Sequence, residues 1–170
     1  MCTKLAPAEH LRIRPIAMTD FAHVHQWSKD PAFCEANEWD IHRDEAELRD
    51  WWQCCVTGIA SDFVRMGIEL DQKLIGYADL ANIEDSSAEL GIAIGESALW
   101  GKGIGYRSSK KMIEYASEQC NIQVLNAETH ETNNRSRRML ERLGFSELSR
   151  IGSELYLGVD TPLIQYNLSL

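Results

Sequence analysis

The sequence predicts a single α+β domain, in which helices flank a mixed, mostly antiparallel sheet. Residues 63–95 alternate apolar and polar side chains in short runs between turn residues, which is typical of an antiparallel meander. A glycine-rich segment at 100–105 then opens a pattern of alternating helices and strands. Because we find no internal repeat and no linker, the 170 residues predict one domain over 1–170, with its core at about 11–168.

The first third of the chain predicts one strand and two helices. Residues 11–16 alternate apolar and polar side chains, which indicates a half-buried strand. The helix that follows should end at Asp30-Pro31, because a residue before proline disfavours the helical conformation. Residues 31–41 form an acidic, aromatic loop in this prediction. A second helix, with an apolar stripe, runs over about 42–57.

The remaining elements follow from turn residues and from changes in periodicity. Three strands form the meander, and a helix begins at the glycine-rich segment and ends near residue 119. A buried strand, a helix that ends at Gly144 and two further strands complete the chain. The predicted order is therefore β-α-α-β-β-β-α-β-α-β-β. The helix in this second half lies at 132–143, after the one that begins at the glycine-rich segment. The strands lie at 63–70, 74–80, 89–95, 122–127, from 145, and at 163–168.

Composition excludes several classes of protein. The net charge of −9 and the pI near 5.0 argue against a nucleic-acid partner, and they suit a cationic partner such as an amine. No apolar run approaches the roughly 18 residues that span a bilayer, and the N-terminus lacks a signal peptide. We therefore expect a cytoplasmic protein that does not contact a membrane. The cysteines predict reduced, mostly buried thiols: Cys2, Cys34, Cys54, Cys55 and Cys120. His23 and His25 are two residues apart within a helical pattern, so we expect no metal site.

The segment Trp100-Gly101-Lys102-Gly103-Ile104-Gly105 suits an anion at the start of a helix. The first turn of a helix has unpaired N–H groups, and glycines let the backbone approach a phosphate closely. Lys102 and Arg107 could add positive charge. A glycine-rich turn before a core helix is the plain alternative, and a Walker loop is excluded because its lysine motif is absent.

A dinucleotide fingerprint is nearly present in the same segment. The pattern Gly103-x-Gly105-x-x-Ser108 is followed by Glu128 at the end of the next strand. That fingerprint should open a series of parallel βαβ units, whereas here an antiparallel meander precedes it. The topology therefore argues against a dinucleotide site.

Two ordered segments resemble the GNAT N-acetyltransferases. Trp100-x-x-Gly103-x-Gly105 is similar to the family's Arg/Gln-x-x-Gly-x-Gly/Ala hallmark after its fourth strand, with tryptophan as a departure. Asn133-x-x-Ser136, followed by Leu143-Gly144-Phe145, is similar to its second signature. Trp-Gly-Lys-Gly resembles the branch of ribosomal-protein N-terminal (RimJ/RimL-like) and spermidine acetyltransferases. The resemblance covers about 11–168.

The resemblance implies a GNAT fold with acetyl-coenzyme A in a gap beside the fourth strand. The pantetheine arm would pair with that strand's backbone, and the pyrophosphate would lie on backbone amides of the glycine loop. Asn133 would lie near the pantetheine, a role compatible with capping the following helix. The implied cofactor-binding residues are Ile92, Ala93, Ile94, Trp100, Gly101, Lys102, Gly103, Ile104, Gly105, Tyr106 and Asn133.

The resemblance leaves the catalytic acid open. Many relatives carry a tyrosine seven residues after the asparagine, and this chain has Leu140 there. Ser136 could take the role, chiefly by a hydrogen bond to the developing thiolate. The alternative is an ordinary serine on the helix surface.

The acceptor amine must lose a proton before it attacks. Glu89 stands eleven residues before Trp100, a spacing at which histone-acetylating relatives place their catalytic glutamate. Glu69 and Asp79 are competing candidates, and we favour exposed strand carboxylates for these two. An exposed strand carboxylate is also the alternative for Glu89. Ile92 or Ala93 would offer a backbone N–H to the oxyanion.

The acceptor would enter beside residues 31–41. Glu35 and Trp39 could bind its ammonium group by charge and cation–π contacts, although Trp39 could equally pin this loop to the core. The arginines of the late helix are interpreted as a solvated face: Arg135, Arg137, Arg138 and Arg142.

The predicted function is acetyl transfer from acetyl-coenzyme A to a primary amine by direct attack in a ternary complex. The amine could belong to a peptide N-terminus, a polyamine or another small molecule, and the resemblance also allows a homodimer. One alternative is a coenzyme-A-binding module without turnover, suggested by Leu140. The other is a dinucleotide-binding oxidoreductase.

Overall fold

The computed structural model describes residues 9–170, so Cys2 lies outside the described residues. The strands and helices follow one another in this order: β1 (Leu11–Pro15), α1 (Phe21–Trp27), α2 (Pro31–Asn37), α3 (Glu45–Thr57), β2 (Val64–Leu70), β3 (Lys73–Glu84), β4 (Ser87–Ile94), α4 (Ile104–Cys120), β5 (Val124–His130), α5 (Asn134–Arg142), β6 (Ser146–Ser149), β7 (Ser153–Tyr156) and β8 (Val159–Ser169). The α+β class and a mixed, mostly antiparallel sheet are confirmed. The predicted order lacked α2 and one of the three late strands.

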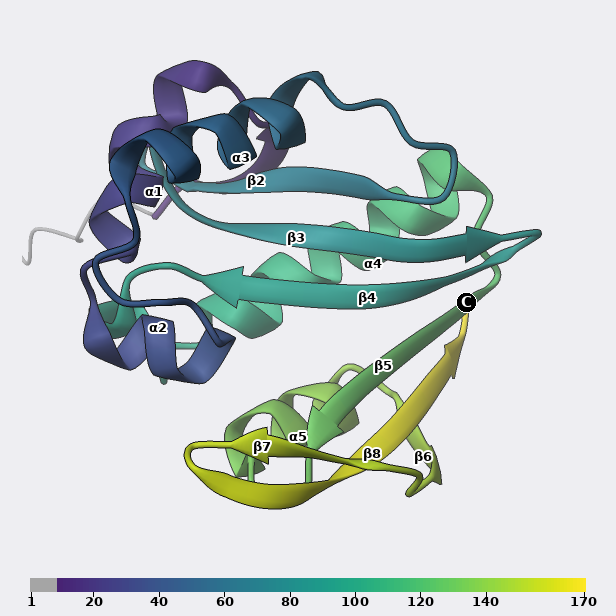
Figure 1. Cartoon of the computed structure of the whole chain (residues 1–170). Helices are drawn as coiled ribbons and strands as arrows, with labels where there is room; N and C mark the ends of the chain where they lie inside the picture. Colours follow the sequence, from purple (N-terminus) through teal and green to yellow (C-terminus); the bar gives the residue numbers. More distant parts are fainter. Residues whose placement is uncertain (1–8) are drawn as a thin grey trace, which may run out of the picture.

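The strands form one sheet in the order β1-β2-β3-β4-β5-β8-β6, and β7 pairs with β8. Among the described residues only β4 and β5 pair in parallel, through Ser87–Glu89 and Val124–Asn126. Beyond this short contact the two strands diverge, so the sheet opens into two parts (Figure 1). Parallel neighbours need a crossover, and α4 supplies it.

Helices cover both faces of the first part of the sheet. Helix α4 lies on one face, and α1 and α3 lie on the other (Figure 1). Buried residues of α4, including Met112 and Ala116, form a core with the sheet strands. A second core joins α1, α2 and α3 to β3 and β4 through aromatic residues such as Trp27 and Trp52. The two cores hold β4 from both sides, which fixes the strand that borders the gap.

Residues 31–41 are not the loop that we predicted. The Asp30 carboxylate accepts hydrogen bonds from the N–H groups of Ala32 and Phe33 and so caps α2, and Pro31 occupies its first turn. Proline is favoured there because the first helical N–H has no partner in the helix. The dipeptide that ends one helix therefore also begins the next.

Strand β7, which is four residues long, was not expected. Gly152 and Gly158 flank it, and both have positive φ, which allows tight turns on either side. The hairpin with β8 brings β7 back toward the gap between β4 and β5. Its position therefore depends on tertiary contacts.

The described cysteines are unpaired, as expected, but the prediction that they are mostly buried was wrong. Only Cys34 is buried, whereas Cys54 is exposed and the thiols of Cys55 and Cys120 are half-buried. Within residues 9–170 no helix has the length and apolar character to cross a membrane. The same residues contain no cluster of three or more His, Cys, Asp or Glu side chains that suits a metal ion.

Candidate active site

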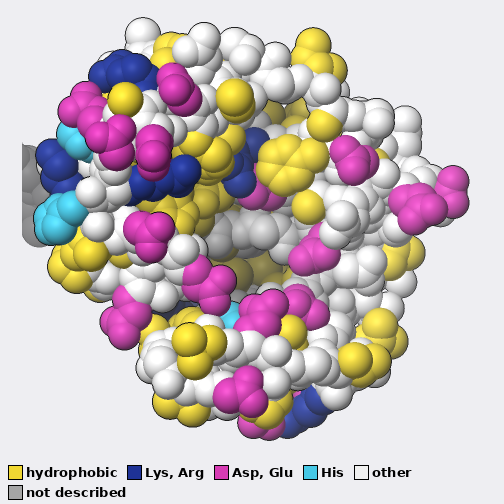
Figure 2. All heavy atoms as spheres, in the orientation of Figure 1, with side chains coloured by type: hydrophobic (Ala, Val, Ile, Leu, Met, Phe, Trp, Pro, Cys, Tyr) yellow, Lys and Arg dark blue, Asp and Glu magenta, His cyan; other side chains and the backbone are white. Residues whose placement is uncertain are grey.

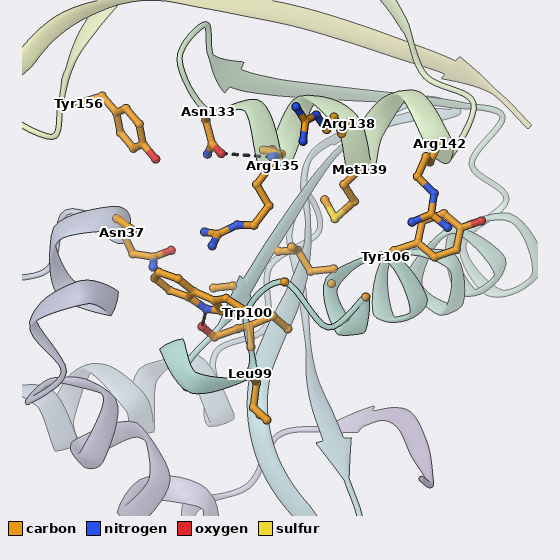
Figure 3. A pocket seen from close by; sticks show the side chains of 18 residues that line it. Asn37, Leu99, Trp100, Tyr106, Asn133, Arg135, Arg138, Met139, Arg142 and Tyr156 are labelled. Carbon is orange, nitrogen blue, oxygen red and sulfur yellow. Dashed lines mark hydrogen bonds between the residues drawn. The ribbon is translucent and has the colours of Figure 1, made fainter. Parts of the chain in front are cut away.

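A cavity of about 500 Å³ opens where β4 and β5 diverge. Strand β4, the glycine loop, α4, α5, α2 and β7 all contribute to its walls (Figure 3). Most of the predicted cofactor-binding residues line it: Ile92, Ala93, Ile94, Trp100, Gly101, Gly103, Gly105, Tyr106 and Asn133. The candidate Ser136 lines it too.

The backbone of β4 offers hydrogen-bonding groups to the gap. The Gly95 N–H donates to the Ile75 carbonyl of β3, at 2.7 Å, whereas the Ser86 carbonyl accepts from Val124 of β5, at 3.1 Å. Alternate residues of a strand point these groups to opposite neighbours. Odd-numbered residues of β4 therefore pair with β3, and Ile92 presents its N–H and carbonyl to the gap.

The glycine loop presents the free start of α4. Gly101 and Gly103 have φ of +76°, and a Cβ at either would meet nothing within 4 Å, so the turn itself requires glycine. Gly103 caps the helix without a side-chain hydrogen bond. The N–H groups of the first turn, at Ile104, Gly105 and Tyr106, therefore have no partner within the helix and carry partial positive charge.

Trp100 closes one end of β4. Its indole Nε1–H donates to the Ile94 carbonyl at 2.9 Å. The Arg135 guanidinium lies over the indole ring, 4.3 Å from the ring centroid. Trp100, which departs from the family hallmark, thus connects the glycine loop to β4 through a hydrogen bond. It also forms a cation–π contact with Arg135 of α5.

Three arginines of α5 line the cavity, and all three are exposed, so the solvated face that we expected borders the cavity. Arg135, Arg138 and Arg142 lie on the cavity side of α5, and Arg142 stacks on the Tyr106 ring at 4.3 Å. Arg137 instead donates to the Glu131 carbonyl and does not line the cavity. The spacings of three and four residues place these three side chains on one helix face.

The other expected cations of the loop do not reach the cavity. Lys102 is exposed and does not line it. Arg107 pairs with Glu9 at 3.0 Å. The positively charged side chains that line the cavity with the glycine loop therefore belong to α5.

Asn133 caps α5, as predicted, and it also borders the cavity. Its Oδ1 accepts a hydrogen bond from the Ser136 N–H at 3.2 Å and caps α5, while the side chain borders the cavity (Figure 3). Ser136 lies one turn further along the same helix. Leu140, where many relatives have tyrosine, is 3% exposed and belongs to the core.

Glu89 lies beside the cavity and does not line it. It forms the last β4 pair with β5, opposite Asn126, and accepts a hydrogen bond from Asn82 at 3.2 Å. Ile104, one of the predicted cofactor residues, has its side chain buried in the core at 3% exposure, so only its backbone can contribute.

Glu69 and Asp79 are paired with arginines and are not the exposed carboxylates that we expected. Hydrogen bonds from Arg12, at 2.6 Å, and from Arg14 lower the pKa of Glu69 against the effect of burial. Asp79 receives two hydrogen bonds from Arg65, at 2.8 and 2.7 Å. Burial lowers the pKa of the Arg65 guanidinium, but the Asp79 hydrogen bonds outweigh this effect and raise it. Both carboxylates therefore have structural partners.

Glu35 and Trp39 lie away from the cavity lining. Glu35 is exposed on α2, and Trp39 packs edge-on against Phe33 and Trp51 with centroids 5.0 and 5.3 Å apart. The arrangement matches the alternative in which Trp39 pins its segment to the core.

A guanidinium group of the chain itself occupies the neighbouring aromatic surface. Arg65 lies over the rings of Trp51, Phe63 and Tyr77, at 5.4, 5.4 and 4.1 Å from their centroids. Burial raises the pKa of Tyr77 to about 12, so this phenol stays protonated and neutral. These three rings thus already have a cation–π partner, the Arg65 guanidinium.

The family can now be assigned. Residues 10–146 match the family described as Acetyltransferase (GNAT) domain. The chain belongs to this family. GNAT enzymes are acyltransferases that take an acetyl group from acetyl-coenzyme A, and the gap between β4 and β5 is where the resemblance placed that cofactor.

Solved structures share the GNAT fold of this chain. The spermidine N-acetyltransferase of Vibrio cholerae, solved with CoA and spermine, is 20% identical with a TM-score of 0.80, over 94% of this chain and 95% of that one. RimL, a ribosomal alpha-N-protein acetyltransferase solved with coenzyme A, is 18% identical with a TM-score of 0.80, over 94% of each chain.

A curated relative is much longer than this chain. The uncharacterized protein MJ1062 of Methanocaldococcus jannaschii is 24% identical over an alignment of 157 positions, and the alignment covers 88% of this chain and 31% of that protein. The chain therefore spans about a third of the curated relative that it matches.

Sequence reasoning missed two walls of this GNAT cavity. Ala36 and Asn37 reach it from α2, and Tyr156 reaches it from β7 (Figure 3). Asp30-Pro31 could have signalled α2, because this dipeptide is a good helix start. For Tyr156 no local pattern was available, since the hairpin that places it forms by tertiary contacts.

Proposed function

We propose that this chain transfers an acetyl group from acetyl-coenzyme A to a primary amine, by direct attack in a ternary complex. One observation carries the proposal: a single cavity joins the free start of α4 to the exposed backbone of β4. An anion and an extended, amide-containing arm can thus be held by the same cavity, as coenzyme A requires.

The phosphates would occupy the glycine-loop end. The N–H groups of the first turn of α4 can donate to the pyrophosphate, and Arg138 and Arg142 add charge. A neighbouring cavity of about 300 Å³ shares Tyr106 and Arg142 and adds Lys110, which suits a further phosphate. The pantetheine arm would pair with the backbone at Ile92.

The acceptor would approach from the face that carries α1–α3. Figure 2 shows this face hollowed between the two parts of the sheet, with acidic side chains around the hollow. Glu89 and Glu128 lie on this face by strand register, and neither has an arginine or lysine partner within the described residues. A cationic acceptor, such as a polyamine or a protein N-terminus, would be attracted there. The acceptors in the names of the related acetyltransferases support this class.

Glu89 and Ser136 are the proposed catalytic groups. Glu89 is next to the point where β4 and β5 separate, so it could accept the amine proton through a water molecule. Ser136 borders the cavity and could donate a hydrogen bond to the leaving sulfur. The Ile92 N–H faces the gap and suits the oxyanion. Glu35 and Trp39 remain predictions for the rim of the acceptor site.

Release of free thiol from acetyl-coenzyme A tests the proposal. The wild-type chain would be assayed with polyamines, peptides with free N-termini and aminoglycosides, each against a matched N-acetylated compound that cannot react. We expect sustained thiol release with at least one amine and none with its acetylated control. Stabilisation by acetyl-coenzyme A without release in any arm would favour the coenzyme-A-binding module instead.

A homodimer and a cytoplasmic location are two further predictions for this chain. Five apolar side chains between β6 and the start of β8 are 51–71% exposed, which supports the homodimer: Leu148, Ile151, Leu155, Leu157 and Val159. Light scattering would test it, since a monomer at working concentration would contradict it. The cytoplasmic location rests on the unpaired thiols alone.

A further inference from the structure

Tyr156 has features that the assigned roles do not explain. It lies at the end of β7, lines the cavity and is 9% exposed. Its hydroxyl makes no hydrogen bond to any residue within 9–170, and in Figure 3 it points into the space bordered by Asn133, Arg135 and Asn37. The hydroxyl therefore faces the cavity and is available to donate a hydrogen bond to a bound group.

The ring of Tyr156 is held in this direction by its neighbours. His130, the last residue of β5, stacks on it with centroids 4.1 Å apart and planes 8° from parallel. Glu154 of β7 lies 3.4 Å from the His130 Nε2. Backbone pairing with Val159 fixes the strand itself. The phenol is thus preorganised between β5 and the cavity.

The position that relatives use for a tyrosine cannot supply a proton here. Leu140 is buried in the core and does not line the cavity, whereas Tyr156 of β7 does. We propose that Tyr156 is the proton donor to the coenzyme A sulfur, in a reaction that rests on the proposed function above. Ser136 then provides only a supporting hydrogen bond.

Acetyl transfer proceeds by addition to the thioester carbon and then by loss of the thiolate. The amine lone pair forms the C–N bond to the thioester carbon, and the C=O π electrons move to oxygen. As the carbonyl re-forms, the C–S bond breaks and its electron pair leaves with sulfur. The Tyr156 O–H proton passes to that sulfur and gives the free thiol. The resulting phenolate recovers a proton that the amine nitrogen loses, so the enzyme is regenerated.

Tyr156→Phe tests the role with little change in shape. With the best amine, we expect kcat to fall about 30-fold or more, and the KM for acetyl-coenzyme A to stay within about threefold of wild type. Tyr166→Phe is the matched control, because Tyr166 is also buried and its hydroxyl also lacks a partner among the described residues, but it does not line the cavity. This control should keep wild-type kcat.

A binding comparison adds a readout that a purely structural role would not move. Calorimetry with coenzyme A and with its desulfo analogue gives the contribution of the sulfur to affinity. The wild-type chain should bind coenzyme A more tightly than the desulfo analogue. In Tyr156→Phe, which loses one hydrogen bond to the sulfur, this ratio of affinities should fall by about fivefold. In Tyr166→Phe the ratio should be unchanged.

The outcomes separate this inference from the proposed function. Tyr156→Phe with kcat within about twofold of wild type overturns the inference alone, because the wild-type enzyme still turns over. Wild type without thiol release for any amine overturns both. A fall in kcat with an unchanged preference for the sulfur also overturns the role as proton donor to sulfur.

Discussion

The two ends of the cavity are lined by different chemistry. At the glycine-loop end, backbone N–H groups of α4 and the guanidinium groups of Arg138 and Arg142 provide positive charge. At the other end, the uncharged side chains of Asn133, Ser136 and Tyr156 line the cavity beside Arg135, whose guanidinium group lies over the Trp100 ring. One end suits an anion and the other suits proton transfer and hydrogen bonding. Binding and chemistry should therefore be separable by mutation.

The largest effect is expected at the loop. Gly103→Val places a β-branched side chain at φ +76°, which strains the turn and covers the start of α4. Stabilisation by acetyl-coenzyme A in thermal scanning should disappear, with a loss of affinity of about 100-fold or more. Gly144→Val is the control, since its φ of +96° gives similar strain in a turn that does not line the cavity. Equal loss in both variants would contradict a specific role for the loop.

The arginines of α5 should have the next largest effect. Arg138→Ala combined with Arg142→Ala removes two charges from the anion end, and we expect coenzyme A affinity to fall about tenfold. The loss should shrink as salt is added, because charge contacts are screened. Arg137→Ala, on the same helix but away from the cavity, should leave affinity unchanged. Calorimetry measures all three, and an equal loss in Arg137→Ala would argue for a general helix effect.

Ser136→Ala tests whether the Ser136 hydroxyl takes part in the reaction. Removing one hydrogen bond to the sulfur should lower kcat about fivefold and leave the KM for acetyl-coenzyme A unchanged. Steady-state kinetics measures both. A rise in KM at constant kcat would show that the serine only binds the cofactor. Ser146→Ala, on exposed β6, is the control.

Glu69→Gln should have the smallest effect on activity but a clear effect on stability. The pKa of Glu69 is lowered in the fold, so its stabilisation is present above the pKa of the unfolded state and lost as pH falls through the folded value. At pH 7 we expect the variant to lose about 2 kcal/mol, or about 4–8 °C in Tm. Thermal scans at pH 7 and pH 3 should show the difference narrowing in acid. An unchanged difference would contradict the ion pairs with Arg12 and Arg14.

The parts of the molecule with local sequence patterns could be predicted. Gly101 and Gly103 need positive φ, and Asn133 caps a helix, so each leaves a signal in its own segment. The meander and the helix after the loop have their own periodicity. These patterns were sufficient for the fold class and for most of the residues that line the glycine-loop end of the cavity.

The reactive end could not be predicted in the same way. Tyr156 reaches the cavity only because β7 folds back against His130, 26 positions earlier in the chain. Trp39 does not line the cavity, and an aromatic pattern in the sequence does not show that Arg65, from β2, lies over the neighbouring Trp51 ring. Composition indicates which side chains are available, and tertiary packing decides which are free.

Titration of the wild-type chain with coenzyme A by isothermal calorimetry tests the central claim most directly. The account predicts saturable binding at one site per chain, which acetyl-coenzyme A displaces, NADH does not and Gly103→Val abolishes. Absence of binding by the folded wild-type chain, or equal binding by Gly103→Val, would contradict it.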